Sequence, residues 1–227
     1  MSLIRGRLPT QRVELLGVVL LTLGMMGLLW WNRDSPAAAT IVLTTVEALL
    51  PVALALVAAG LLASDPLLEL LLTVPQPAPK TLLQRLVVVV VIGSLLAGGL
   101  LLMAKGWAVP LPQTGARLLL FWLSPALFWA GVTVWGAIWR GQMLDGVGLG
   151  LGLWAIAFFA IPLIEPWCRA LGPSQTCPAA LWSPLLSLVR PFDPWWMANR
   201  VGLLVVGIGL LGAALRLAAD EQRLLQA

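Results

Sequence analysis

The sequence predicts an all-α, polytopic membrane protein, built as a single transmembrane domain of six helices over residues 1–227. Composition is the first observation behind this fold class. Hydrophobic residues make up 60% of the chain and charged residues only 11%, with a mean hydropathy of +0.95, whereas about 25% charged residues is usual in soluble domains. The second observation is that apolar runs long enough to cross a bilayer recur along the whole chain.

Six apolar segments are expected to span the bilayer, because roughly 20 helical residues are needed to cross its hydrocarbon core. These spans are expected at residues 14–31, 40–63, 85–104, 116–138, 146–164 and 200–219. The third is the clearest, since residues 86–92 are all apolar. The fifth contains Gly148 and Gly152 at the GxxxG spacing, which allows close approach of a neighbouring helix.

Basic residues predict how the chain is oriented. Six spans place both termini on one side, and the N-terminal arm carries Arg5, Arg7 and Arg12 with no acid before Glu14. The positive-inside rule assigns such a side to the cytoplasm. We therefore expect a multi-pass protein of the cell's inner or plasma membrane with both termini cytoplasmic. The net charge of +4 is spread over short loops, so it indicates orientation in the lipid bilayer and not a nucleic-acid partner.

Missing residue types exclude several classes of chemistry. The chain has no histidine, which excludes histidine-based catalytic triads, HExxH zinc sites and histidine-ligated haem held by this chain alone. It also has no GxxxxGK[ST] motif, so it is not expected to bind ATP by a Walker mechanism. We expect no enzymatic activity, no catalytic residue, no metal and no cofactor in this chain.

The loop between the second and third spans carries helix signals. Asp65 and Pro66 are typical of a helix start, and Pro75 stops the helix about ten residues later. This pattern predicts a short amphipathic helix at about residues 65–75 in the cytoplasmic interface. From the residues alone, an interfacial helix that merely turns the chain is an equally good interpretation.

The same segment, LLELLLTVP at residues 67–75 followed by Lys80 and Arg85, resembles the element after the second helix of type-2 ABC transporter permeases. In that family this element is a cytoplasmic coupling helix that docks on an ATPase subunit. The charged run that usually precedes the family's glutamate is replaced here by Ser64-Asp65-Pro66. The resemblance implies that the ATPase-coupling residues are Asp65, Leu68, Glu69, Leu70, Thr73 and Pro75.

A long proline-rich loop, at about residues 165–199, separates the last two expected spans. Its apolar piece at residues 181–189 is too short to cross a membrane, which predicts a re-entrant or interfacial helix. The stretches SPLLSL at 183–188 and FDPWWMANR at 192–200 resemble the short outer helices of the same family. Cys168 and Cys177 both lie in this loop, and we expect a disulfide between them if the loop faces an oxidising compartment.

Glu47 is the charge most clearly inside an expected span. A charged residue in a membrane helix is costly and often functional. Glu47 is expected either to face a substrate path or to pair with a basic residue such as Arg117 or Arg200. A structural ion pair, or a side chain that reaches the nearby outer interface, is the alternative interpretation.

The resemblance implies a permease subunit of an ABC transporter, more specifically of an exporter. Two six-helix subunits, as a homodimer or a heterodimer, would enclose the pathway, and ATP with Mg²⁺ would be bound by a separate ABC ATPase subunit. Two alternatives stay open: a permease of the cytochrome c maturation type, and a non-transporting structural or assembly subunit of an energy-transducing membrane complex.

Overall fold

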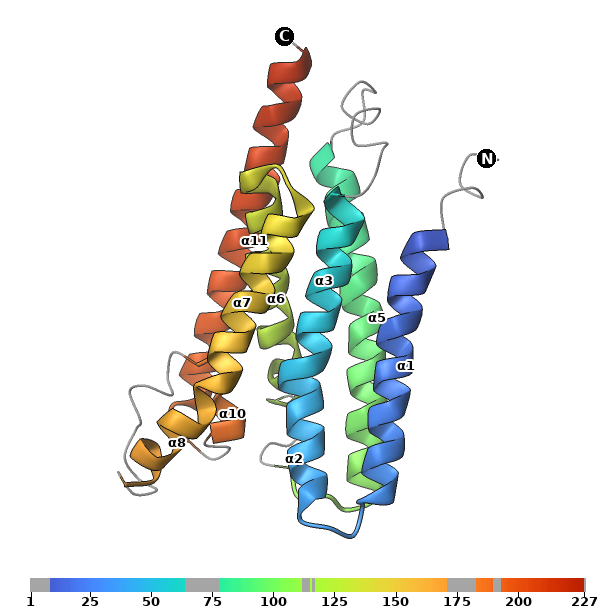
Figure 1. The fold of residues 1–227 in the computed structure, drawn as a ribbon, viewed down its shortest axis with the longest axis vertical. Helices are drawn as coiled ribbons and strands as arrows, with labels where there is room; N and C mark the ends of the chain where they lie inside the picture. The colour runs from blue at the N-terminus through green and yellow to red at the C-terminus, as the bar shows by residue number, and fades with distance from the viewer. Residues whose placement is uncertain are drawn as a thin grey trace.

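The computed structural model describes residues 9–63, 78–111, 115, 117–170, 183–189 and 193–226, and every regular element in these ranges is a helix. The long helices lie side by side in one elongated bundle (Figure 1). The start of α1 (Pro9–Trp31) and the end of α11 (Trp196–Gln226) lie at the same end of the bundle (Figure 1). We call this the terminal end and the opposite one the distal end.

The first half of the chain runs along the bundle three times (Figure 1). From the terminal end α1 runs to the distal end, where residues 32–36 turn the chain. The chain then returns through three consecutive helical pieces, α2 (Ala37–Leu43), the π-helix η1 (Thr44–Leu49) and α3 (Leu50–Ala63). From the terminal end, α5 (Ala78–Gly106) runs back to the distal end.

The second half repeats this alternation. α6 (Arg117–Arg140) runs to the terminal end, and α7 (Met143–Phe159) leaves it again. α8 (Ile161–Ala170) continues α7 after a bend, and the short α10 (Leu186–Val189) lies at the distal end beside the start of α11 (Figure 1).

Several of these helices are long and apolar enough to cross a bilayer. Four candidate spans lie among the described residues, and the bent pair α7 and α8 makes a fifth if it is counted as one span. The four are Ala37–Gly60, Leu82–Gly106, Arg117–Arg140 and Trp196–Asp220. Residues Leu15–Trp31 of α1 also form an apolar helix, but it is shorter than these four spans. The chain is therefore a multi-pass, all-helical membrane protein, and the count of six spans stays a prediction.

The helices differ from the expected spans mainly at their ends. α5 begins at Ala78 and α11 at Trp196, before the expected starts at 85 and 200, because each helix continues beyond the long apolar run that marks its span. The span expected at 146–164 is broken at Ala160, where α7 and α8 meet at 40°. Pro162 accounts for the break, since it has no N–H for the carbonyl of Phe158.

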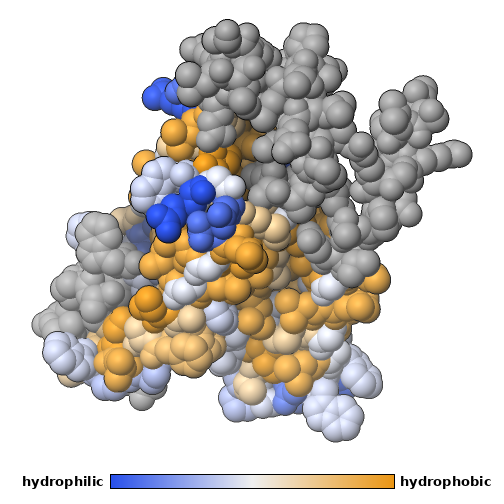
Figure 2. Space-filling view, turned by 45° about the horizontal axis from the view of Figure 1, so that its top comes forward, coloured by the Kyte–Doolittle hydropathy of each residue, from blue (hydrophilic) through white to orange (hydrophobic). Residues whose placement is uncertain are grey.

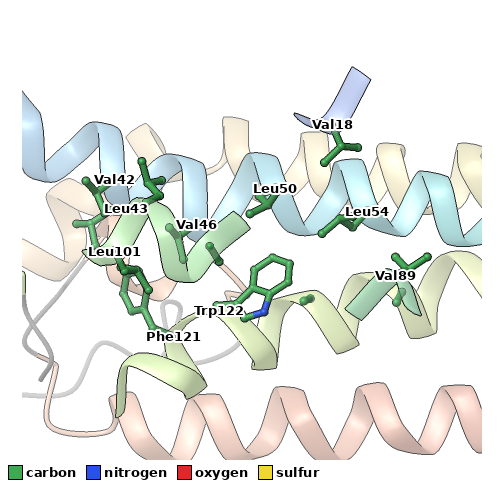
Figure 3. Close-up of a cluster of buried hydrophobic side chains, with 14 of the residues drawn as sticks. Val18, Val42, Leu43, Val46, Leu50, Leu54, Val89, Leu101, Phe121 and Trp122 are labelled. Carbon is green, nitrogen blue, oxygen red and sulfur yellow. The ribbon is translucent and has the colours of Figure 1, made fainter. Parts of the chain in front are cut away.

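A continuous apolar core joins α1, α3, α5 and α6. Figure 3 shows part of it, including Val18, Leu50, Val89 and Phe121. α3 and α5 approach closely at Gly93, where an added Cβ atom would lie only 2.3 Å from Cδ1 of Leu54. The core therefore depends on small residues where helices cross.

The indole N–H of Trp122 is hydrogen-bonded inside this core. Its Nε1 donates a hydrogen bond to Oγ of Ser94 at 3.0 Å. Ser94 in turn donates to the backbone oxygen of Val90 at 2.8 Å. The indole thus adds apolar area without leaving its N–H unpaired.

Glycine also brings α7 against α6, but at positions other than the expected pair. An added Cβ atom would lie 2.3 Å from the backbone oxygen of Thr133 at Gly146, and 2.1 Å from Cγ2 of Thr133 at Gly150. At Gly148 and Gly152 it would meet no atom within 4 Å. The GxxxG pair that packs is therefore Gly146 and Gly150, whereas Gly148 and Gly152 lie on the open face of α7.

The surface is apolar over much of the described bundle, with hydrophilic residues gathered toward its ends (Figure 2). Four strongly exposed tryptophans belong to elements at the distal end: Trp30, Trp31, Trp167 and Trp195. Tryptophan is enriched where a membrane meets water, so these side chains are consistent with a membrane–water interface at the distal end.

Candidate functional site: a buried ion pair toward the distal end

Glu47 and Arg200 form an ion pair inside the bundle, and both side chains are completely buried. Glu47 lies in η1 and Arg200 in the second turn of α11, so the pair joins the second helical passage of the chain to the last one. Charged side chains inside a membrane protein are expensive, and they usually pair with each other or mark a functional site. This pair is therefore the first candidate for a functional centre.

The π-helix that carries Glu47 follows from the sequence around it. Pro51 has no N–H to offer the carbonyl of Glu47, four residues earlier, and its ring would clash with that carbonyl in a regular α-helix. The chain accommodates this with a wider turn, in which the N–H of Leu50 donates to the backbone oxygen of Thr45. Such π-turns are frequent at functional sites, and this one sets the direction in which Glu47 points.

Ser187 of α10 connects the two charges. Its backbone N–H donates to Oε1 of Glu47 at 3.1 Å. Its Oγ accepts hydrogen bonds from Nη2 of Arg200 at 2.8 Å and from Nε1 of Trp196 at 2.9 Å. One small residue thus ties α10 to η1 and to α11, which explains why a helix of only four residues keeps a defined place.

Arg200 makes further contacts with the turn before α10 and with two aromatic rings. Its Nη1 donates to the backbone oxygen of Pro184 at 3.4 Å. Its guanidinium carbon lies 5.3 Å from the ring centre of Trp196 and 6.0 Å from that of Phe121. Aromatic faces attract cations at such distances, more strongly where water is excluded. The charge of Arg200 is therefore balanced by Glu47 and by the rings together.

Neighbouring residues hold the same two segments together. Asn199 donates from Nδ2 to the backbone oxygen of Ser183 at 3.1 Å, and the hydroxyl oxygen of Ser183 accepts from the N–H of Leu185 at 3.2 Å. At the start of α11, Oδ1 of Asp193 accepts from the N–H of Trp195 at 2.8 Å. Pro194 follows Asp193, the order that is typical of a helix start.

We call the set Glu47, Ser183, Pro184, Ser187, Trp196, Asn199 and Arg200 the distal clamp. Not every polar atom in it is satisfied: within the described part of the chain, Oε2 of Glu47 and Nε of Arg200 have no hydrogen-bond partner. The clamp offers two opposite charges that neutralise each other, and both are closed off from the surface. The clamp joins η1, α10 and α11 through contacts that lie inside the bundle.

The other residues singled out in the sequence lie elsewhere. Arg117, the alternative partner of Glu47, begins α6 and is exposed, so the structure brings Glu47 to Arg200 and not to Arg117. The expected ATPase-coupling residues lie outside the described residues, namely Asp65, Leu68, Glu69, Leu70, Thr73 and Pro75. Among the described residues, no group of three or more His, Cys, Asp or Glu side chains is placed to hold a metal ion.

Cys168, at the distal end, is completely buried and disulfide-bonded. The second cysteine of the chain, Cys177, lies outside the described residues. The pairing of these two cysteines therefore stays a prediction.

Sequence reasoning missed Ser187 and Trp196 as contacts of the ion pair. Ser187 lies in the SPLLSL stretch and Trp196 in the FDPWWMANR stretch. These stretches resemble elements of a family, but the resemblance does not predict which side chains are in contact. The placement of Pro51 four residues after Glu47 was the one local signal for the π-turn.

Comparisons of the chain with protein-family models, with curated proteins and with solved structures found no match.

Proposed function

We propose that the chain is the membrane-spanning subunit of an ABC transporter of the type-2 permease class, driven by a separate ATPase subunit. One observation carries the proposal. α3 ends at Ala63 and α5 begins at Ala78, both at the terminal end of the bundle (Figure 1). The intervening segment 64–77 contains the residues that resemble a coupling helix, and it connects two candidate spans at the end of the bundle where α1 begins and α11 ends.

The direction of the helices supports the same proposal. If α1 and the bent pair α7 and α8 each count as one span, the chain crosses the membrane six times, and both ends fall on one side. We place that side in the cytoplasm, which the positive-inside rule favours for the basic N-terminal residues Arg5, Arg7 and Arg12. An ATPase that binds ATP with Mg²⁺ in the cytoplasm then meets segment 64–77 directly.

In the proposed transporter, two such subunits, identical or related, enclose the pathway. ATP binding closes the ATPase pair, and segment 64–77 transmits this movement to α3 and α5, so that cargo is released on the distal side. Glu69 and Leu70 are assigned the main contact with the ATPase. The distal clamp holds α10 and α11 against the second span, and it is assigned a structural role because its charges are closed off from any path.

The experiment that tests the proposal is ATPase stimulation in a reconstituted complex. The ATPase is the Walker-motif protein that co-purifies with the tagged chain. The double variant Glu69→Arg with Leu70→Asp reverses one charge and removes one apolar contact, and we expect it to abolish assembly or reduce stimulated turnover at least tenfold. The control, Asp34→Arg, changes an exposed acid in the turn at the distal end, and it should leave turnover unchanged.

Two outcomes contradict the proposal. Unchanged assembly and turnover in the double variant would remove the coupling assignment. Co-purification with respiratory or photosynthetic subunits and with no Walker-motif protein would instead favour the structural or assembly role.

A further inference from the structure

The outer face of α8 is made of apolar side chains. It begins at the last residue of α7, and Phe159, Leu163 and Trp167 follow one another at every fourth position with 71%, 73% and 77% of their surface exposed. Residues four apart lie on the same side of a helix. The other exposed residues of α8, among those whose side chains the structure describes, are Pro162, Pro166 and Ala170. We call these six residues the α8 face, which no described polar side chain interrupts.

Packing on the opposite side determines which way this face points. Ile161 and Ile164 pack against the apolar core, and Cys168 is completely buried in it. α8 also contacts α10 beside it at the distal end (Figure 1). The bundle therefore holds α8 on one side only, and the α8 face needs a cover from outside the chain.

Neither water nor a protein partner is the cover that the α8 face favours. Large apolar side chains such as Leu163 and Trp167 cost about 1.5–3 kcal/mol each when they stay in water instead of being buried. Protein interfaces usually have a polar rim around their apolar centre, whereas the exposed neighbours here are apolar too. The face also continues onto α7, where Ile156 is 67% exposed three residues before Phe159. Since α7 and α8 together qualify as one broken span, this continuity favours lipid.

The lengths of the two helices place α8 in the distal half of the bilayer. Asp145, near the start of α7, forms a surface ion pair with Arg140 and so marks the terminal interface. From Asp145 to Phe159, α7 rises about 21 Å, which is about 9 Å less than the hydrocarbon thickness of about 30 Å. α8 then bends by 40°, so each of its residues rises about 1.1 Å along the direction of α7. Over eight residues this adds about 9 Å, which brings Trp167 to the distal interface.

We propose that α8 crosses the distal leaflet of the bilayer obliquely, with the α8 face against lipid acyl chains and Trp167 at the level of the headgroups. Tryptophan is the side chain most typical of that level. Leu163, one turn earlier, lies about 5 Å deeper. The break after α7 thus lets a helix of only 17 residues end inside the hydrocarbon while a slanted helix completes the crossing. The proposal does not depend on the transport function, because it requires only that α7 lies in a membrane.

Depth-dependent fluorescence quenching tests this proposal on the full chain in vesicles of phosphatidylcholine with a minor share of phosphatidylglycerol. A fluorescent amino acid that is excited outside the tryptophan band replaces Leu163. Leu95 is the matched control, because it is 72% exposed and lies near the middle of the α5 span. Asp34, exposed in the distal turn, is the control for water. The quenchers are lipids brominated near the headgroup, lipids brominated near the chain end, and iodide on both sides of the membrane.

Position 163 should be quenched at least about threefold more strongly by the lipid brominated near the headgroup than by iodide. Position 95 should be quenched most by the lipid brominated near the chain end, and position 34 by iodide. If the variant at 163 does not fold, position 167 takes its place and should show the same preference for the shallow bromines.

Three results overturn the proposal. Strongest quenching of position 163 by iodide would show that water covers the α8 face. Quenching as deep as at position 95 would place α8 in the middle of the bilayer. Protection from all three quenchers would show that protein covers the face, either a second copy of the chain or another subunit.

Discussion

Glu47 would cost about 2.5–3.5 kcal/mol near the centre of a membrane helix if its charge were unpaired. In the structure this cost is opposed by Arg200, by the N–H of Ser187 and by two aromatic rings that surround the charges. Because both side chains are fully buried, neither can turn to water when its partner is lost. The two residues are therefore expected to behave as one unit in stability measurements.

Removing either charge alone should destabilise the protein strongly. We expect Glu47→Ala and Arg200→Ala each to lower the free energy of unfolding by about 3–5 kcal/mol, because each leaves one buried charge uncompensated. The measurement is unfolding of the purified chain in mixed detergent micelles, followed by tryptophan fluorescence. Arg117→Ala is the control, since Arg117 is exposed at the start of α6.

A double variant separates a structural pair from a functional one. Replacing both charges with apolar residues, as in Glu47→Leu with Arg200→Met, should recover most of the lost stability, because no unpaired charge remains. Transport in the reconstituted complex should recover with it. Single variants that stay within about 1 kcal/mol of the unmodified chain would contradict the clamp, and so would a stable double variant without transport.

At the scale of elements, the packing of α7 on α6 depends on which face of α7 its glycines occupy. Gly146 and Gly150 face Thr133, while Gly148 and Gly152 face open space. The two pairs have the same spacing and lie on one helix, which makes them matched probes. They differ only in whether another helix lies against them.

Alanine at these positions should therefore have opposite effects. Gly146→Ala places a methyl group against the backbone of α6, and overpacking of this kind costs about 1–3 kcal/mol. Gly148→Ala adds no contact and replaces glycine by a better helix former, which should be neutral or stabilising by up to about 1 kcal/mol. The same unfolding assay checks both. Equal effects of the two variants would show that α7 does not pack as described.

The composition and the apolar runs were enough to predict a helical membrane protein and the approximate position of each long apolar helix. This is because hydrophobicity largely determines which segments insert into a bilayer. It could not predict which helix faces meet. GxxxG spacing occurs twice in α7, and only the position of α6 decides between Gly146 with Gly150 and Gly148 with Gly152. Likewise, the sequence offers both Arg117 and Arg200 as partners of Glu47, and only the three-dimensional structure shows that Arg200 is the partner.

Backbone irregularities were less predictable than helices, although each has a local cause. Pro51 accounts for the π-turn at Glu47, and Pro162 accounts for the break after α7. Pro125, in contrast, lies inside a continuous α6. Whether a proline breaks, widens or merely interrupts a helix depends on what its neighbours can pack against, and this information is not local in the sequence.

At the scale of the whole molecule, the two ends of the bundle carry different structural features. The distal end carries the clamp, the disulfide-bonded Cys168 and four exposed tryptophans. The terminal end carries the start of α1, the end of α11 and the junctions with segment 64–77. This polarity is what a permease needs if energy is received on one side and cargo leaves on the other.

Photo-crosslinking tests this account most directly. A photoreactive amino acid is placed at position 70 in segment 64–77, or at position 34 in the distal turn as the control, and the chain is expressed with its ATPase in native membranes. The account predicts a crosslinked product between position 70 and a Walker-motif protein, and none from position 34. A well-folded chain that forms no ATPase product from position 70, or forms one from position 34 instead, would contradict it.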